Sequence, residues 1–137
     1  MSTPAAEQPL SLSRYPETLA VVRLPAGAEI PTWAESSSVF SITATATETS
    51  LVCAGRSVPK KARHEKPLTA FAVDGTLDLT VPGILVRLLN PLADDDINVF
   101  VISTFDTDWI LVPTAAADRA EEAWRRSGHT VAPAVPV

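Results

Sequence analysis

Cysteine is nearly absent from this chain, and acidic residues outnumber basic ones. The single cysteine, Cys53, excludes a disulfide within the chain and permits a reducing compartment. The formal net charge of -5 argues against a nucleic-acid partner, because phosphate binding needs clustered lysine and arginine. No apolar run is long enough to span a membrane, and the first residues lack a secretory pattern. We therefore expect a soluble cytoplasmic protein that binds neither nucleic acid nor membrane.

Catalytic signatures are missing as well. The two histidines, His64 and His129, stand alone, without metal-ligand spacing. No serine or cysteine lies in a nucleophile-elbow context, and there is no glycine-rich phosphate loop. The acidic run at residues 94–96 lacks the spacing and the closing glutamate of a calcium loop. These absences predict a protein that is not an enzyme and uses no metal or cofactor.

Basic residues gather once, in a segment too rich in helix breakers to form a long helix. The cluster consists of Lys60, Lys61, Arg63, His64 and Lys66. Charge runs of this kind usually form solvated loops, which is our interpretation here. An anion-binding site is the alternative.

The composition that remains is that of an ordinary globular protein. Apolar residues make up 46% of the 137 residues, which suits one compact unit or two very small halves sharing a core. Residues 1–13 are rich in Ser, Pro, Ala and Gln and are predicted to form a loose tail. Residues 130–137 alternate Ala, Pro and Val and are predicted to fray, with a short closing strand at 129–131 as the alternative.

Strand and helix patterns alternate between the tails. Runs of β-branched and apolar residues, closed by turn residues, predict strands. The predicted strands cover residues 18–24, 39–45, 50–54, 69–73, 77–81, 97–103 and 109–112. Pro31 is placed to start a short helical turn over residues 31–34.

Two longer helices are predicted in the second half. The first has an apolar face formed by Leu85, Leu88, Leu89 and Leu92. Pro91 is expected to kink it or end it early. The second is capped by Thr114, runs to about Ser127, and has an inner face of Ala116, Ala117, Ala120, Ala123 and Trp124. The second half thus has the order βαββαβ and the first half resembles a worn copy, which predicts an α+β, ferredoxin-like fold with helices on one face of antiparallel sheets.

The run from Ile102 to Val112 is the most informative stretch, because it has an apolar strand on each side of a polar turn with two carboxylates. Aspartate is a poor strand residue, since its side chain competes for backbone hydrogen bonds. Asp106 is explained as a turn former. Asp108 directly precedes an apolar strand, and a carboxylate there can receive an ammonium or guanidinium group. The alternative is a strand-end carboxylate paired with arginine or water.

Gly83 opens the first predicted long helix, directly after Val81 and Pro82. Free backbone N–H groups and the positive end of the helix can receive a ligand carboxylate at such a turn. The alternative is that Gly83 only allows the chain to turn tightly.

Three blocks of this sequence resemble the ACT domain family. They are residues 30–34 with 40–43 and 48–53, residues 79–85 with 91–93, and residues 102–112. The resemblance runs from Tyr15 to Val131. Within the family, the chain resembles small bacterial proteins with paired ACT units, which are similar to the ACT modules of mammalian cytosolic arginine sensors. It implies a degenerate first ACT half over residues 15–74, a second ACT domain over 75–131, and disordered tails at 1–14 and 132–137.

The resemblance also implies a function: a non-catalytic regulatory sensor that binds a small ligand, with an amino acid expected, between ACT units. The implied ligand-binding residues are Ser41, Ile42, Val81, Pro82, Gly83, Ile84, Thr104, Phe105, Asp106, Thr107 and Asp108. A homodimer or a regulated partner protein would carry the output.

The sequence departs from the family pattern at three places. Ala44 stands where the family often has arginine, Thr47-Glu48-Thr49 replaces the usual acidic-acidic-apolar turn, and Asp96 stands where a glycine is common before the hairpin. An assembly module that binds no ligand is therefore the rival function. A small enzyme that uses Asp106 and Asp108 as an acid–base pair is the third and least favoured alternative.

Overall fold

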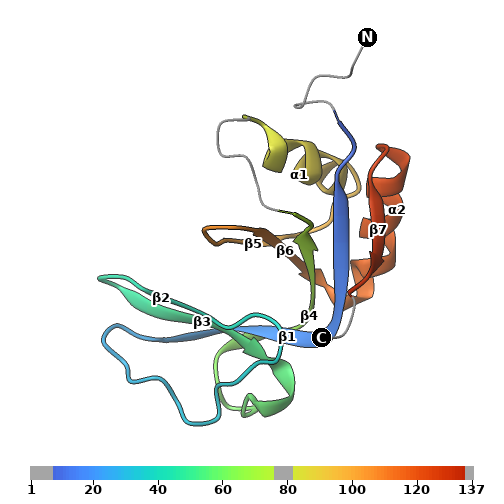
Figure 1. Cartoon of the computed structure of the whole chain (residues 1–137). Helices are drawn as coiled ribbons and strands as arrows, with labels where there is room; N and C mark the ends of the chain where they lie inside the picture. The colour runs from blue at the N-terminus through green and yellow to red at the C-terminus, as the bar shows by residue number, and fades with distance from the viewer. Residues whose placement is uncertain (1–7, 76–81, 135–137) are drawn as a thin grey trace.

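One sheet with two helices on one face forms the protein in the computed structural model, which describes residues 8–75 and 82–134 (Figure 1). The strands are β1 (Ser11–Pro25), β2 (Ser41–Ala44), β3 (Glu48–Ala54), β4 (His64–Val73), β5 (Phe100–Ser103), β6 (Asp108–Pro113) and β7 (Thr130–Pro133). The helices are α1 (Ile84–Asp94) and α2 (Ala117–Arg126), with short 3-10 turns η2 (Gly55–Ser57) and η3 (Thr114–Ala116). The α+β prediction of an antiparallel sheet with helices on one face is confirmed.

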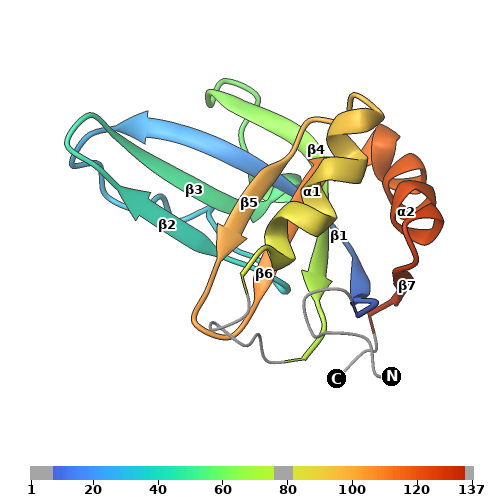
Figure 2. The same cartoon turned by 90° about the horizontal axis from the view of Figure 1, so that it is seen from above.

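The strand order is β2-β3-β1-β4-β6-β5, and β7 pairs in parallel with the start of β1. All other pairings are antiparallel. The long strand β1 therefore serves both ends of the molecule: its first residues lie beside β7, and its last residues pair with β3. Figure 2 shows β2 and β3 at the end without helices, and α1 and α2 at the opposite end.

The sheet begins and ends further out along the chain than the sequence predicted. β1 starts at Ser11, not at Thr18, because Leu12 pairs with Val73 and is buried. Residues 11–14 therefore belong to a strand and not to a loose tail. Pro16 lies where the register between β1 and β4 shifts, between Arg14 and Thr18. Proline has no backbone N–H to donate to a neighbouring strand, and none is needed at such an irregularity. The closing strand β7 continues to Pro133.

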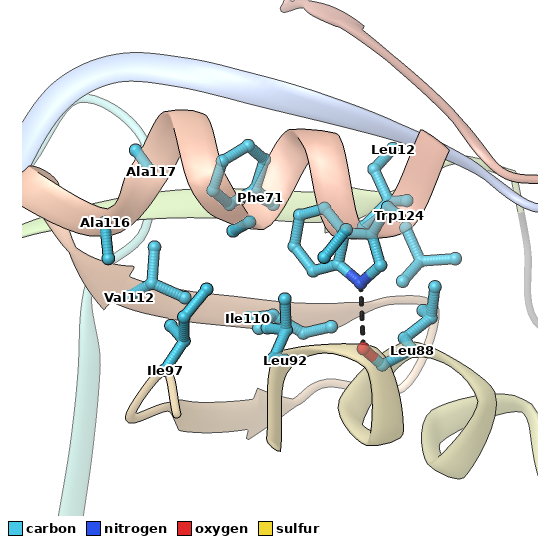
Figure 3. Packing of buried hydrophobic residues seen from close by; sticks show 13 residues of the cluster. Leu12, Phe71, Leu88, Leu92, Ile97, Ile110, Val112, Ala116, Ala117 and Trp124 are labelled. Atoms are coloured by element: carbon cyan, nitrogen blue, oxygen red, sulfur yellow. Dashed lines mark hydrogen bonds between the residues drawn. The ribbon is translucent and has the colours of Figure 1, made fainter. Parts of the chain in front are cut away.

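The sheet is barrel-like, and its buried residues form three clusters. The helix core lies between the sheet and the helices and includes Phe71, Leu88, Leu92, Ile110 and Trp124 (Figure 3). The interior core lies on the other face of β4 and β6 and consists of Leu19, Val39, Val52, Leu68, Ala70 and Leu111. The loop core, at the end without helices, consists of Ala20, Val22, Leu51, Cys53 and Val58. Because side chains alternate along a strand, β4 supplies both the helix core and the interior core.

The helix core is centred on Trp124. Its ring meets Phe71 edge-on, with ring centroids 4.8 Å apart. Its Nε1–H donates to the backbone oxygen of Leu88 over 2.8 Å, so the buried indole nitrogen is satisfied (Figure 3). Leu88 and Leu92 are buried as predicted. Pro91 lies inside α1, so the helix does not stop at Pro91 itself, and it ends nearby at Asp94. Burial of Leu88 and Leu92 on either side of Pro91 offsets the lost ladder bond.

The first half has no α-helix within residues 8–75. The predicted helical turn at residues 31–34 is a single turn, closed by a bond from Ala34 N to Pro31 O of 3.1 Å. A tandem βαββαβ arrangement is therefore not confirmed, since one sheet runs through both halves and shares β1. The predicted strand at 77–81 lies outside the described residues. β5 begins at Phe100, because Ile97 packs into the helix core from the preceding loop.

The buried carboxylate of Glu17 fastens the loop that covers the helix-free end. Its oxygens accept hydrogen bonds from the hydroxyls of Ser36, Ser37 and Ser38 at 2.6, 2.8 and 2.6 Å. The backbone N–H groups of Ser37 and Ser38 and the guanidinium of Arg56 also donate to it. Burial raises the pKa of the Glu17 carboxyl, but the bonds from Arg56 and the serines outweigh burial and hold that pKa well below its usual range.

Candidate functional site

The predicted β-hairpin is formed by β5 and β6, and its turn is fixed by side-chain hydrogen bonds. Thr104 N donates to Thr107 O over 2.8 Å, and Thr107 N donates to the Thr104 hydroxyl over 3.1 Å. Ser103 and Asp108 face each other across the hairpin, and the Ser103 hydroxyl donates to the Asp108 carboxylate over 2.6 Å. The Asp108 carboxylate therefore has a fixed position, and a single oxygen is used by this bond.

The two aromatic residues of the hairpin have different surroundings. Trp109 packs against Tyr15, with ring centroids 4.9 Å apart, and against the interior core. Phe105 lies at the tip of the hairpin and is 88% exposed. Trp109 thus holds the hairpin to the sheet, whereas Phe105 presents a bare apolar ring.

Strand alternation divides the predicted site residues between faces of the sheet. Ile110 belongs to the helix core and Trp109 to the interior core, so Asp108 is on the side of the helices. Ser41 is paired with Val52 of the interior core and is therefore on the other face. The hairpin brings residues 104–108 together, and within the described chain Ser41 does not share their face.

Ile42, the other predicted site residue on β2, is paired with Leu51 of the loop core. It lies on a strand at one end of the strand order and is 42% exposed. Like Phe105, Ile42 is therefore an exposed apolar residue that can contact another molecule.

Gly83 is the N-terminal cap of α1 and has φ 81° and ψ 3°. This left-handed conformation requires glycine on its own account. A Cβ at Gly83 would meet nothing within 4 Å, so space around it is open. Pro82 is exposed and Ile84 is half-buried beside it, while Val81 lies outside the described residues. α1 covers the face of the sheet to which Asp108 belongs, because its Leu88 packs into the helix core with Ile110.

Sequence reasoning missed a set of cavities at the opposite end of β6. The first has a volume of about 470 Å³ and lies between the start of β4 and the start of β5, with Glu65, Lys66 and Phe100 among its lining residues. The five cavities that we describe within residues 8–75 and 82–134 do not include Gly83 or Asp108 in their linings. The basic run at residues 60–66 is the feature of the sequence that could have indicated these cavities, because several of its residues line them.

Two family models match parts of this chain. Residues 63–126 match the ACT domain, and residues 17–61 match a model described as an N-terminal domain. The ACT match covers β4, α1, β5, β6 and α2, and thus the hairpin with Asp108. No curated protein sequence matches the chain.

Solved structures share the fold over most of its length. A protein of Agrobacterium tumefaciens is 28% identical, with a TM-score of 0.87 over 94% of this chain and 96% of that one. A Vibrio cholerae protein of unknown function, named as a possible transport protein, is 14% identical, with a TM-score of 0.72 over 86% and 89%. The regulatory subunit of aspartate kinase from Thermus flavus is 8% identical, with a TM-score of 0.59 over 88% and 97%.

The comparisons agree on the fold. Residues 63–126 match the ACT domain, and the fold is similar to that of an aspartate kinase regulatory subunit. The specific likeness to the arginine sensors is not shown by these matches. Within residues 8–75 and 82–134, no helix combines the length and apolar character needed to cross a membrane.

Proposed function

We propose that this protein is a non-catalytic regulatory module that binds a small ligand, and that the ligand is an amino acid. The observation that carries the proposal is the ACT match over residues 63–126, supported by the fold shared with a regulatory subunit of aspartate kinase. A module of this kind acts by binding one state of an assembly more tightly than another, so a partner protein or a second copy delivers the output. We also propose that the protein acts in the cytoplasm.

The hairpin supplies the acidic half of the proposed site. Asp108 receives the ammonium group of the ligand, because a charge-assisted hydrogen bond is stronger than a neutral one. Ser103 holds the carboxylate in place through its 2.6 Å bond. The ligand carboxylate is received by backbone N–H groups at the start of α1, which Gly83 opens toward open space.

A second copy of the chain completes the site in this proposal. Ser41 lies on the other face of the sheet from Asp108, so the two cannot meet one ligand within one chain. Phe105 at the hairpin tip and Ile42 on β2 are exposed apolar residues that suit contact with another subunit. The proposal therefore predicts that ligand and dimer stabilise each other.

Thermal unfolding of the full chain in the presence of each common amino acid tests the proposal. A ligand at about 100 times its dissociation constant stabilises the native state by roughly 2.7 kcal/mol, which raises the unfolding midpoint visibly. Asp108→Asn should abolish the rise. Glu122→Gln is the control, because Glu122 is an exposed carboxylate on α2 and is not among the predicted site residues.

Ser103→Ala separates charge from geometry, since it removes the 2.6 Å bond that positions the Asp108 carboxylate and keeps the charge of that carboxylate. The proposal expects weaker binding in this variant but not its loss. A screen in which no amino acid raises the midpoint of the wild type, or a rise that survives Asp108→Asn unchanged, contradicts the proposed site.

An assembly module without a ligand is the second candidate, and the exposed edge of the sheet favours it. β5 stands at one end of the strand order, and its residues Phe100 and Val101 are 40% and 37% exposed. Edge strands with apolar residues are templates for pairing with another chain. Val101→Lys should then split a dimer seen by analytical ultracentrifugation, while no amino acid changes the unfolding midpoint.

A further inference from the structure

The sheet has a gap at the end of β6, and the gap forms a cavity. β6 ends at Pro113, which is paired with Leu68 of β4. β4 begins four residues before Leu68, at His64, and is paired there with β1 on its other side. Across the gap, β5 begins at Phe100. The resulting cavity of about 470 Å³ is within the range of small-molecule sites.

Two further cavities adjoin the first along the start of β4. One of about 230 Å³ is lined by Val21, Arg23, Arg63, His64, Glu65 and Phe100, and it shares Glu65 and Phe100 with the first cavity. Another of about 350 Å³ is lined by Thr18, Gly55, Arg56, Lys66 and Pro67, and it shares Lys66 and Pro67 with the first. The three cavities together surround the segment from His64 to Pro67.

The charges at this gap are of the opposite sign to the charge of the chain. Arg23, Arg63 and Lys66 line the cavities together with one carboxylate, Glu65, although the chain has a net charge of -5. A local excess of positive charge in an acidic protein attracts anions to this place. Phe100, 40% exposed, adds an apolar wall.

Some of these charged groups already have partners, and two do not. Arg23 pairs with Glu48 at 3.6 Å, and Lys66 donates to the backbone oxygen of Gly55 over 3.0 Å. The side chains of Arg63 and Glu65 have no hydrogen bond or ion pair within residues 8–75 and 82–134. Both are exposed, so a free cation and a free carboxylate line the same cavity.

We propose that this gap is a second ligand site, distinct from the hairpin, that takes a small dicarboxylate bearing an ammonium group, as an acidic amino acid does. Arg63 binds one carboxylate through its planar fork of donors, and the positive field of Arg23 and Lys66 favours the second. Glu65 receives the ammonium group. Phe100 covers the methylene groups of the ligand.

The basic run itself provides the control. Lys60 and Lys61 are exposed members of the same run as Arg63, yet neither lines any of the three cavities. Removal of either lysine lowers the overall positive charge of the segment as much as removal of Arg63 does. Among Lys60, Lys61 and Arg63, binding at the proposed site depends on Arg63 alone, whereas diffuse attraction of anions depends on all three.

Isothermal titration calorimetry of the full chain with L-glutamate, L-aspartate, succinate and L-lysine tests the proposal. The wild type should bind at least one acidic amino acid in preference to L-lysine. Arg63→Ala should weaken that binding about tenfold or more, as loss of a charge-assisted bond does, and Lys60→Ala should change it less than about twofold. Glu65→Gln should weaken binding of the amino acid but not of succinate, because succinate has no ammonium group.

Three outcomes overturn the proposal: no binding of either acidic amino acid, equal losses in Arg63→Ala and Lys60→Ala, or binding that Asp108→Asn abolishes and Arg63→Ala leaves intact. The last outcome assigns the ligand to the hairpin, so it supports the proposed function while it rejects this second site. Failure of the hairpin site, in turn, leaves the Arg63 result unchanged.

Discussion

The two ends of this sheet are covered in different ways. At one end, α1 and α2 cover the sheet, and Trp124 and Phe71 are fully buried between them. At the other end, loops cover it, the buried side chains are smaller, and Trp33 packs against the loop core only partly buried. A helix brings its own backbone hydrogen bonds to a covering layer, but a loop does not. The loop end therefore needs a polar anchor, whereas the helix end relies on packing.

Glu17 is that anchor. It lies on β1, and it gathers three consecutive serines from the covering loop together with Arg56 of η2. Its side chain is only 6% exposed, so water does not substitute for these donors. Burial, with a further contribution from the charge of Glu17, raises the pKa of the Cys53 thiol in the adjacent loop core, which keeps this thiol inert.

Removal of the largest side chain from the helix core should have the greatest effect. Trp124→Ala leaves a cavity beside Phe71 and removes the hydrogen bond that the indole donates to the backbone oxygen of Leu88. We therefore expect a loss of about 3–5 kcal/mol of unfolding free energy in urea titrations. Trp33→Ala, at the loop end, should cost clearly less. Equal losses would contradict the difference between the two ends.

Removal of the polar anchor should come next. Glu17→Ala leaves several donors of the serine loop unpaired, and we expect a loss of about 2–3 kcal/mol in the same assay. Glu29→Gln is the control, because Glu29 is an exposed residue of the same covering loop. A loss below that of the control would show that packing alone holds the loop end.

The anchor also predicts a pH dependence. Because the pKa of Glu17 is lowered in the folded state, its contribution is present above the pKa of an unfolded glutamate, about 4.3, and declines as the pH falls below it. The difference in unfolding free energy between wild type and Glu17→Gln should therefore shrink from pH 6 to pH 3. A difference that stays constant over this range would contradict the account.

At the helix end, His129 predicts a smaller pH effect. It is 5% exposed, and its Nδ1 accepts a bond from Leu10 N over 3.0 Å. Burial, and then the nearby Arg87, lower its pKa, so its neutral form stabilises the fold above about pH 6.5 and this contribution declines as the pH falls below that value. His129→Gln should flatten the fall of stability between pH 7 and 5.

The smallest effect is expected for the exposed ion pairs of the helix end. Arg14 on β1 pairs with Asp118 of α2 at 2.7 Å, but the Asp118 side chain is 95% exposed. Solvent screens such a pair, so Asp118→Asn should lower the unfolding free energy by less than about 0.5 kcal/mol. A loss comparable to that of Glu17→Ala would remove the distinction between a buried anchor and a surface pair.

The helix end was the more predictable of the two from sequence. The periodic leucines of α1, the alanine face of α2 with Trp124, and the hairpin each depend on local spacing, and the structure confirms them. The start of β1 and the anchor at Glu17 depend on pairing with residues far along the chain, such as Val73 and Arg56, and no local pattern reveals those partners. The gap beside Pro113 was missed for the same reason, because its prediction requires knowing where β4, β5 and β6 each begin or end.

The candidate site was predictable in part. The sequence identified the turn, Asp108 and its position at the hairpin, because aspartate is unusual next to an apolar strand. The bond from Ser103 to Asp108 depends on the register of the hairpin. The separation of Ser41 from Asp108 depends on which face of the sheet each side chain occupies, and this follows from strand pairing that the sequence does not reveal. The role of these residues in binding a ligand stays a prediction.

The proposed binding of an amino acid at the hairpin is tested most directly by one calorimetric comparison. The amino acid that raises the unfolding midpoint most is titrated into the wild type, Asp108→Asn and the control Glu122→Gln. The account predicts saturable binding to the wild type and to Glu122→Gln, and its loss in Asp108→Asn. Equal binding to all three proteins, or to none, would contradict it.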